Sequence, residues 1–182
     1  GDGGDEVFGG YRKHLGEKWS STSNLIPKFI RTIIIKTLIE NKNTYYGEIS
    51  RRIRRFLINT HKDGSLRQAG YIEQINADSI KKLFGVNIEN TKKLLDAYRK
   101  SFKDPINAML AADLGFSLAG DMLVKADRMS MANSLEVRSP FLDKDLVEYT
   151  FTLPGKLKIG NFKGKKLLKE SFKNRLPRWS IN

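Results

Sequence analysis

Cysteine is absent from this sequence of 182 residues, and so is any long run of apolar residues. Without cysteine the chain has neither disulfides nor thiolate metal sites, which fits a reducing compartment. The longest apolar patch, around Ile33–Ile35, is bracketed by Arg31 and Lys36 and is too short to span a bilayer. The first residues are acidic, whereas a signal peptide begins with basic residues. We therefore expect a cytoplasmic protein with no membrane partner.

Alternating strand patterns are also scarce, and only Leu157–Ile159 could form a short edge strand. Apolar residues instead recur at helical spacing in most of the chain, for example after Pro27 and after the capping pair Asp104–Pro105. The sequence predicts a mainly α protein, with loops at 20–24 and 61–65. The expected helices are 5–14, 27–38, 49–57, 67–84, 91–101, 105–114, 120–129, 143–151 and 163–174.

The formal net charge is +13, and the positive charge is unevenly distributed. Four arginines stand in RRIRR at 51–55, and nine lysines or arginines stand between 156 and 178 against one acid, Glu170. Residues 41–70 are basic and loosely patterned, and we expect them to form a mobile surface region. A helical module that binds nucleic acid is one interpretation of this charge. It lacks support because aromatic residues are sparse among the basic ones and no helix-turn-helix pattern is evident.

The first eleven residues, GDGGDEVFGGY, combine five glycines with three carboxylates. The ordinary interpretation is a glycine-rich turn in which Asp5 caps a helix. The alternative is a phosphate site, because glycines let backbone N–H groups approach a ligand closely. Carboxylates repel phosphate unless a divalent cation lies between them, and Mg²⁺ binds a few carboxylates together with phosphate oxygens. The composition of this segment leaves both interpretations open.

Two further segments carry charge among apolar residues. The segment 121–143 predicts a methionine-rich helix followed by a turn at Pro140, with these residues in the core: Met122, Met129, Leu135, Phe141 and Leu142. Buried charges need partners, and the segment also contains Lys125, Asp127, Arg128, Glu136 and Arg138. Glu136 and Arg138 could form a structural ion pair or one that orients a substrate.

The segment 160–172 predicts a basic amphipathic helix whose lysines face solvent. In the alternative, Lys165 lies near the helix start and faces a pocket. His14 and His61 have no ligand partner at helical spacing, so we interpret both as ordinary residues.

Three blocks in this order resemble the C-terminal part of the glutamine-hydrolysing asparagine synthetases. They are GDGGDEVFGGY, DRMSMANSLEVRSPFLD and KGKKLLKE before a Leu-Pro. The first is similar to the family's (S)G(E/D)G(G/S)DE(L/V)FGGY, the second is a long and specific match, and the third resembles the family's K-x-x-L-(R/K) helix. Agreement is good over residues 1–15 and 105–178. Residues 16–104 resemble the family only in length and helical character.

The resemblance implies a synthetase domain with an α/β adenine-nucleotide-binding fold of the pyrophosphate-loop ATP pyrophosphatase type, extended by a helical region. This chain, 1–182, would be the helical portion of that domain. Family enzymes use ATP and Mg²⁺ to adenylate the side-chain carboxylate of aspartate. An N-terminal glutaminase domain releases ammonia from glutamine, and the ammonia attacks the acyl-adenylate. Related synthetases amidate other carboxylates, and the resemblance also allows a homodimer.

The resemblance assigns roles to particular residues of this chain. Asp2 matches an acidic residue near the ammonia attack, where many members have glutamate, and Asp5 matches the carboxylate that holds Mg²⁺ on pyrophosphate. Lys165 matches an earlier lysine of the family helix. The residues that the resemblance places near the nucleotide are Asp5, Glu6, Tyr11, Arg128 and Lys165. The family's catalytic lysine, in an Arg-x-Lys segment, would lie beyond Asn182.

Three family features are missing from these 182 residues: the Ser-Gly-Gly-x-Asp-Ser loop, the adenine-binding strands and the nucleophilic cysteine. We therefore expect the chain to be a piece of a longer enzyme that does not synthesise asparagine by itself. We also expect Gly1–Gly4 to be mobile or misplaced, while the helix that Asp5 begins forms because Val7, Phe8 and Tyr11 join a core.

Overall fold

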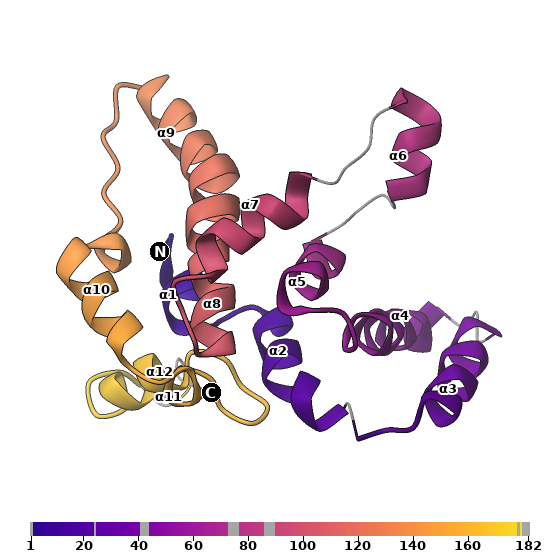
Figure 1. Cartoon of the computed structure of the whole chain (residues 1–182). Coiled ribbons are helices and arrows are strands. Elements are labelled where there is room, and N and C mark those ends of the chain that lie inside the picture. Colours follow the sequence, from indigo (N-terminus) through magenta and orange to yellow (C-terminus); the bar gives the residue numbers. More distant parts are fainter. Residues whose placement is uncertain are drawn as a thin grey trace. The chain divides into compact units, whose positions relative to one another are not determined.

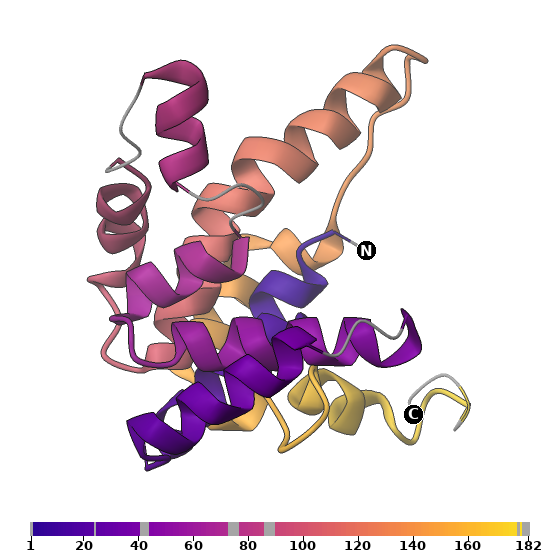
Figure 2. The same cartoon turned by 90° about the vertical axis from the view of Figure 1, so that its right-hand side faces the viewer.

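The computed structural model describes residues 2–23, 25–40, 44–72, 77–85, 90–177 and 179. These residues form helices joined by turns and include no strand, so the expectation of a mainly α chain is confirmed. The chain divides into two compact units, one made of Gly1–Lys18 and Leu94–Asn182 and the other of Trp19–Lys93. Figures 1 and 2 show their helices from two directions. No helix in the described ranges has the length and apolar character that a membrane crossing requires.

A continuous helical rod runs through the first unit (Figure 1). It consists of α8 (Pro105–Ala112), the π-helical segment η1 (Asp113–Met122) and α9 (Leu123–Met131). Asp104 caps it as predicted, because Oδ1 accepts the backbone N–H groups of Ile106 and Asn107 at 2.9 and 3.0 Å. The prediction of a separate helix starting at Gly120 is wrong. Gly120 is exposed with open space around it, and one exposed glycine costs a helix only about 1 kcal/mol.

The short helix α1 (Gly4–Phe8) packs against this rod. Val7 and Phe8 are buried as predicted, and the Phe8 ring meets the edge of Phe141 with ring centroids 5.9 Å apart. The predicted helix 5–14 is interrupted at Gly9, which adopts a left-handed φ of 74° and ends α1. The chain then starts a second helix, α2 (Arg12–Ser23). The predicted loop at 20–24 is therefore wrong as far as Ser23, whose hydroxyl donates to the carbonyl oxygen of Ser20 at 2.8 Å within the helix.

The last part of the first unit contains η2 (Pro140–Leu142), α10 (Lys144–Thr152), α11 (Gly155–Lys158) and α12 (Lys166–Phe172). The predicted strand Leu157–Ile159 is wrong, because the chain forms the helical turn α11 there. Asp104 anchors this turn, since its Oδ2 accepts the Gly155 N–H at 3.0 Å. The following residue, Ile159, joins Ile106 and Leu110 in the buried core of the unit.

The second unit contains α3 (Lys28–Glu40), α4 (Thr44–Asn59), α5 (Gly64–Ile72) and α6 (Ala77–Phe84), and its boundaries fall within α2 and α7 (Asn90–Arg99). Helix α4 contacts both α3 and α5. The helices predicted after Pro27 and over 49–57 are confirmed. The predicted helix 67–84 corresponds to α5 and α6, and residues 73–76 and Asn87 lie outside the described residues. Within 41–70 the described part forms α4 and α5, and its mobility stays a prediction.

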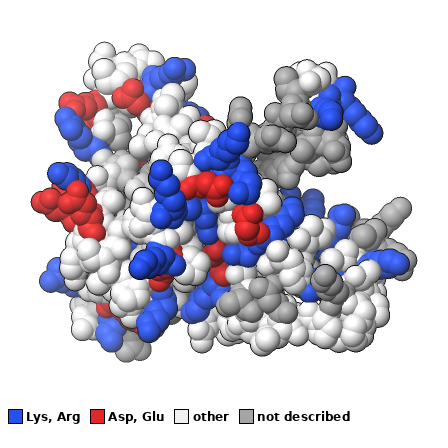
Figure 3. Space-filling view, viewed as in Figure 1, with Lys and Arg blue, Asp and Glu red and all other residues white. Residues whose placement is uncertain are grey.

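The surface is rich in basic residues, as the net charge predicts, and Figure 3 shows Lys and Arg spread over one face with smaller acidic patches. Apolar residues are also exposed. Met129 is 65% exposed, Leu135 59% and Met122 37%, so their prediction as core residues is wrong. The physical reason for Met129 is that it lies on α9, which projects from the unit (Figure 1) and, among the described elements, packs mainly against η1. Leu135 lies in the exposed segment that follows α9. Phe141 and Leu142, by contrast, are partly buried.

Candidate active site

Residues 2–11, a glycine-rich loop that includes the short helix α1, contact the start of α12 and bring two predicted site residues together. Lys165 Nζ donates to Asp5 Oδ1 at 3.0 Å. The two side chains remain 32% and 34% exposed, so water and solutes can reach the pair. The contact joins residues that are far apart in sequence, and it places a cation and a carboxylate at one accessible point. Lys165 directly precedes α12, so its predicted position near the start of the helix is confirmed, while the prediction that it faces a pocket stays a prediction.

Glycines make this contact sterically possible. A side chain at Gly10 would overlap the carboxylate of Asp5 and come within 2.5 Å of Lys165 Cε. A side chain at Gly164 would come within 2.5 Å of the Gly9 carbonyl oxygen. Lys165 itself has a φ of 55°, in the left-handed region that residues other than glycine rarely adopt, at a cost of about 1–3 kcal/mol. The surrounding contacts thus hold Lys165 in a strained backbone conformation that directs its side chain to Asp5.

A second pair of predicted site residues lies beside the first. The Tyr11 hydroxyl donates to Glu6 Oε1 at 2.6 Å, and Glu6 is buried. Burial raises the pKa of Tyr11, and the hydrogen bond to Glu6 and the negative charge of that carboxylate raise it further. Tyr11 therefore stays protonated and acts as a hydrogen-bond donor. Its hydroxyl also lies 3.6 Å from Met122 Sδ, so the loop meets the rod at this point.

A buried charged network that we did not predict anchors the same loop. His14, interpreted as an ordinary residue, is fully buried and its Nε2 lies 2.7 Å from Asp113 Oδ2. The backbone N–H of Tyr11 donates to His14 Nδ1 at 3.3 Å, so Nδ1 carries no proton and Nε2–H donates to Asp113. Lys13 Nζ donates to the other carboxylate oxygen of Asp113 at 2.7 Å. Two consecutive residues of α2 are thus tied to η1.

Asp113 is the centre of this network and is fully buried. Burial by itself would raise the pKa of the Asp113 carboxyl, but the hydrogen bond with His14 and the charge of Lys13 outweigh that effect and lower it. Asp113 is therefore ionised. Sequence patterns offered one indication of this role: a lone carboxylate in the apolar run around Ala112 and Leu114 needs a buried partner. Nothing in the sequence identifies His14 as that partner.

The other predicted residues do not join these two pairs. Asp2 precedes α1 and makes no hydrogen bond or ion pair with a described residue. Arg128 lies on the exposed face of α9 and has no ion pair with a described residue. Glu136 and Arg138 form an ion pair with each other in an exposed segment. That contact confirms that the two are paired, while a role in orienting a substrate stays a prediction.

The accessibility of each carboxylate near the loop decides whether it could be a ligand of Mg²⁺. The described residues contain no group of three or more His, Asp or Glu that could enclose a metal ion. Mg²⁺ is commonly held by one or two carboxylates plus substrate phosphates and water. Asp5 fits that role because its carboxylate is accessible, whereas Glu6 is buried and occupied by Tyr11. The arrangement can therefore offer one carboxylate ligand and one neighbouring ammonium to a phosphate-bound cation.

Comparison with known proteins gives concordant matches. The family model described as asparagine synthase matches residues 1–182. The chain is 28% identical to glutamine-hydrolyzing asparagine synthetase 1 of Bacillus subtilis, over its whole length and 28% of that protein. It is 30% identical to a putative glutamine-hydrolyzing asparagine synthetase of Mycobacterium bovis, over 97% of the chain and 27% of the relative. The chain thus spans little more than a quarter of these relatives. No solved structure gives a significant match.

Proposed function

We propose, for a chain that belongs to the asparagine synthase family, that it is the helical part of an ATP-dependent, glutamine-hydrolysing asparagine synthetase. The complete enzyme would transfer AMP from ATP to the side-chain carboxylate of aspartate and release pyrophosphate. Ammonia from glutamine would then displace AMP and form the amide. The observation that carries this proposal is the accessible contact between Asp5 and Lys165, which lie in two of the blocks that resemble the family.

The chemistry of adenylation explains why such a pair is useful. Charge develops on the departing pyrophosphate, and fixed cations next to it stabilise the transition state. Mg²⁺, when bound, would neutralise phosphate oxygens, and Asp5 would be one of its ligands. Lys165 Nζ can turn from the Asp5 carboxylate toward a phosphate oxygen, since both side chains are partly exposed. The absence of a side chain at Gly10 leaves room for the Asp5 carboxylate and the Lys165 side chain.

The remaining predicted residues receive subordinate roles in the proposal. Glu6 and Tyr11 hold the loop by their hydrogen bond and by the contact of Tyr11 with Met122. Asp2 would act near the attack of ammonia, in a part of the site completed by other segments of the enzyme. Arg128 would approach the nucleotide from α9.

Partners and location follow from the same proposal. The substrates are ATP, aspartate and ammonia derived from glutamine, and the glutaminase domain and the α/β nucleotide-binding core would belong to the same enzyme. The proposed location is the cytoplasm, and the proposed assembly is a homodimer. The relatives carry the name asparagine synthetase, which favours aspartate over another acceptor and does not favour a nucleic-acid-binding module.

The test compares the 182-residue chain with the complete protein in an assay for AMP, pyrophosphate and asparagine. With ATP, Mg²⁺, aspartate and ammonia, the complete protein should form all three in equal amounts, and the chain alone should form none. Glutamine should replace ammonia only in the complete protein. Formation of AMP with another carboxylate but not with aspartate would contradict the assignment of the substrate. Asparagine formation by the chain alone would contradict its assignment as the helical part.

A further inference from the structure

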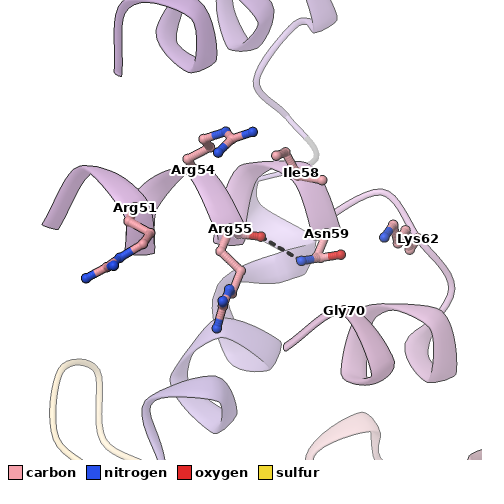
Figure 4. A pocket seen from close by; sticks show the side chains of 7 residues that line it. All are labelled: Arg51, Arg54, Arg55, Ile58, Asn59, Lys62 and Gly70. Atoms are coloured by element: carbon pink, nitrogen blue, oxygen red, sulfur yellow. Dashed lines mark hydrogen bonds between the residues drawn. The ribbon is translucent and has the colours of Figure 1, made fainter. Parts of the chain in front are cut away.

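The second unit contains a basic pocket that the proposed function does not use (Figure 4). Its volume is about 300 Å³, and its polar lining is dominated by cations from α4 and the turn after it. The residues that line it are Arg51, Arg54, Arg55, Ile58, Asn59, Lys62 and Gly70. No carboxylate and no aromatic residue is among them. All of them belong to the second unit, whereas Asp5 and Lys165 belong to the first.

The three arginines of the pocket are closely spaced on one helix. Arg51, Arg54 and Arg55 stand at i, i+3 and i+4, so like charges are neighbours on the surface of α4. Each is exposed and has no ion pair with a described residue. Such an arrangement is slightly unfavourable for an isolated helix, and a bound anion would reverse the effect. Arginine is also the side chain best suited to bind phosphate oxygens in pairs.

The backbone that carries the fourth cation, Lys62, is held by the structure of the turn. Arg67 Nη1 donates to the carbonyl oxygens of Thr60 and Lys62 at 3.1 and 2.9 Å. Asp63 Oδ1 accepts the backbone N–H of Ser65 at 3.0 Å and thereby caps α5. The backbone that carries Lys62 is therefore constrained by contacts on both sides of that residue.

Packing between the two helices shapes the floor of the pocket. Asn59 is buried, and its Nδ2 donates to the carbonyl oxygen of Arg55 at 2.8 Å (Figure 4). Any side chain at Gly70 would collide with the Asn59 amide, so glycine at this position lets α5 lie against the end of α4. The pocket is therefore part of the packing of α4 and α5 and is more than a group of basic residues on an open surface.

From these observations we propose that the pocket binds a small molecule carrying two adjacent phosphate groups. Four cations match the charge of a diphosphate better than that of a single carboxylate, and the volume leaves room for such a group together with the rest of a small molecule. Figure 4 shows the side chains of Arg51, Arg54 and Arg55 pointing in different directions, so they would turn toward a bound anion. The lining has no aromatic side chain on which bases could stack, which disfavours single-stranded nucleic acid. The site is a second anion site of the protein, separate in its residues from the loop at Asp5.

The experiment titrates inorganic pyrophosphate into the complete protein by calorimetry, with EDTA present so that metal-dependent binding elsewhere is suppressed. Arg55→Gln should raise the Kd about tenfold, as expected for the loss of one hydrogen-bonded charge. The matched control is Arg52→Gln, which removes the same charge from the same helix but lies outside the pocket lining, and it should leave the Kd within about twofold. Circular dichroism verifies that both variants keep their helices.

Three results would overturn the proposal. The first is that pyrophosphate does not bind. The second is that Arg52→Gln weakens binding as much as Arg55→Gln, because a diffuse positive field would then be responsible. The third is that a short oligonucleotide binds more tightly than pyrophosphate and depends on the same arginine. The synthetase activity of the complete protein is measured separately, so a failure here leaves the proposed function unaffected.

Discussion

Replacement of Asp113 by asparagine tests whether the buried network anchors the candidate active-site loop. Asp113 is fully buried and its two carboxylate oxygens lie 2.7 Å from His14 and Lys13. An asparagine side chain would keep the shape of the aspartate side chain, but it would leave the charge of Lys13 without its partner. Its NH2 group would also face a hydrogen-bond donor, either the Lys13 ammonium or His14 Nε2–H. Breaking a buried pair in this way costs about 3–5 kcal/mol. Because a domain is stable by about 5–15 kcal/mol, the loss is a large fraction of the total.

The matched control is Lys165→Met, which breaks the other charged contact of the same loop. The partners there are each about one-third exposed, so the free energy of unfolding should fall by only about 0–1 kcal/mol. Urea unfolding followed by circular dichroism at pH 7 measures both variants. If Asp113→Asn and Lys165→Met destabilise the chain equally, the distinction between an anchoring network and an accessible functional pair is wrong.

The pH dependence provides an independent measure of the same network. The folded pKa of Asp113 is lowered, so the unfolded chain binds the proton first as pH falls. The stabilisation from the Asp113 carboxylate is therefore complete above the ordinary pKa of 3.8 and is lost as pH falls through the folded pKa. The stability difference between the parent chain and Asp113→Asn should shrink below pH 3.8. A constant difference down to the folded pKa would refute this reasoning.

Two further predictions concern other parts of the first unit. On the proposed function, Gly10→Ala should displace Asp5 from Lys165 and lower the asparagine-forming activity of the complete protein at least about tenfold, while the far-ultraviolet circular dichroism is retained. Full activity would show that the close approach is unnecessary. Lys158→Met should stabilise the chain by about 1–3 kcal/mol at pH 7, because it removes a buried charge. Burial lowers the pKa of Lys158 to about 8, and the charge of Asp104 offsets only part of this effect. Thermal unfolding should show this gain in stability disappearing between pH 8 and 10.5, because Lys158 of the folded parent chain loses its charge there and the parent chain becomes more stable. A gain that persists above pH 10.5 would contradict the electrostatic cause.

Local patterns predicted much of the helical structure correctly. Pro27 and the pair Asp104–Pro105 mark helix starts because their effect is confined to a single turn of backbone. Asp143 likewise caps α10 by accepting the Leu146 N–H at 3.1 Å. The errors occurred where packing between distant segments decides the structure. The Leu157–Ile159 segment has the composition of a strand, but Leu157 and Lys158 end the helical turn α11, which begins at Gly155, where Asp104 accepts the backbone N–H.

The candidate site was predictable only in part, for the same reason. Asp5 and Lys165 stand out because they lie in segments with unusual composition and with a family resemblance, and the structure brings them together. His14 and Asp113 are separated by 99 residues, and their contact depends on how α2 meets η1. The exposure of some apolar side chains was also predicted wrongly, because it too depends on packing between distant segments. Met129 and Leu135 have the apolar character of core residues, but Met129 lies on α9, which among the described elements packs mainly against η1, and Leu135 lies in the exposed segment after α9.

The most direct test of the proposed function is the Mg²⁺ dependence of asparagine formation in the complete protein carrying Asp5→Asn. Asparagine is uncharged and almost isosteric with aspartate, so the loop and its glycines should keep their structure. If Asp5 is a ligand of the metal on the phosphates, the variant should need at least about tenfold more Mg²⁺ for half-maximal rate, consistent with the loss of a charged ligand. An Mg²⁺ titration that coincides with that of the parent enzyme would contradict the assignment of this loop to the active site.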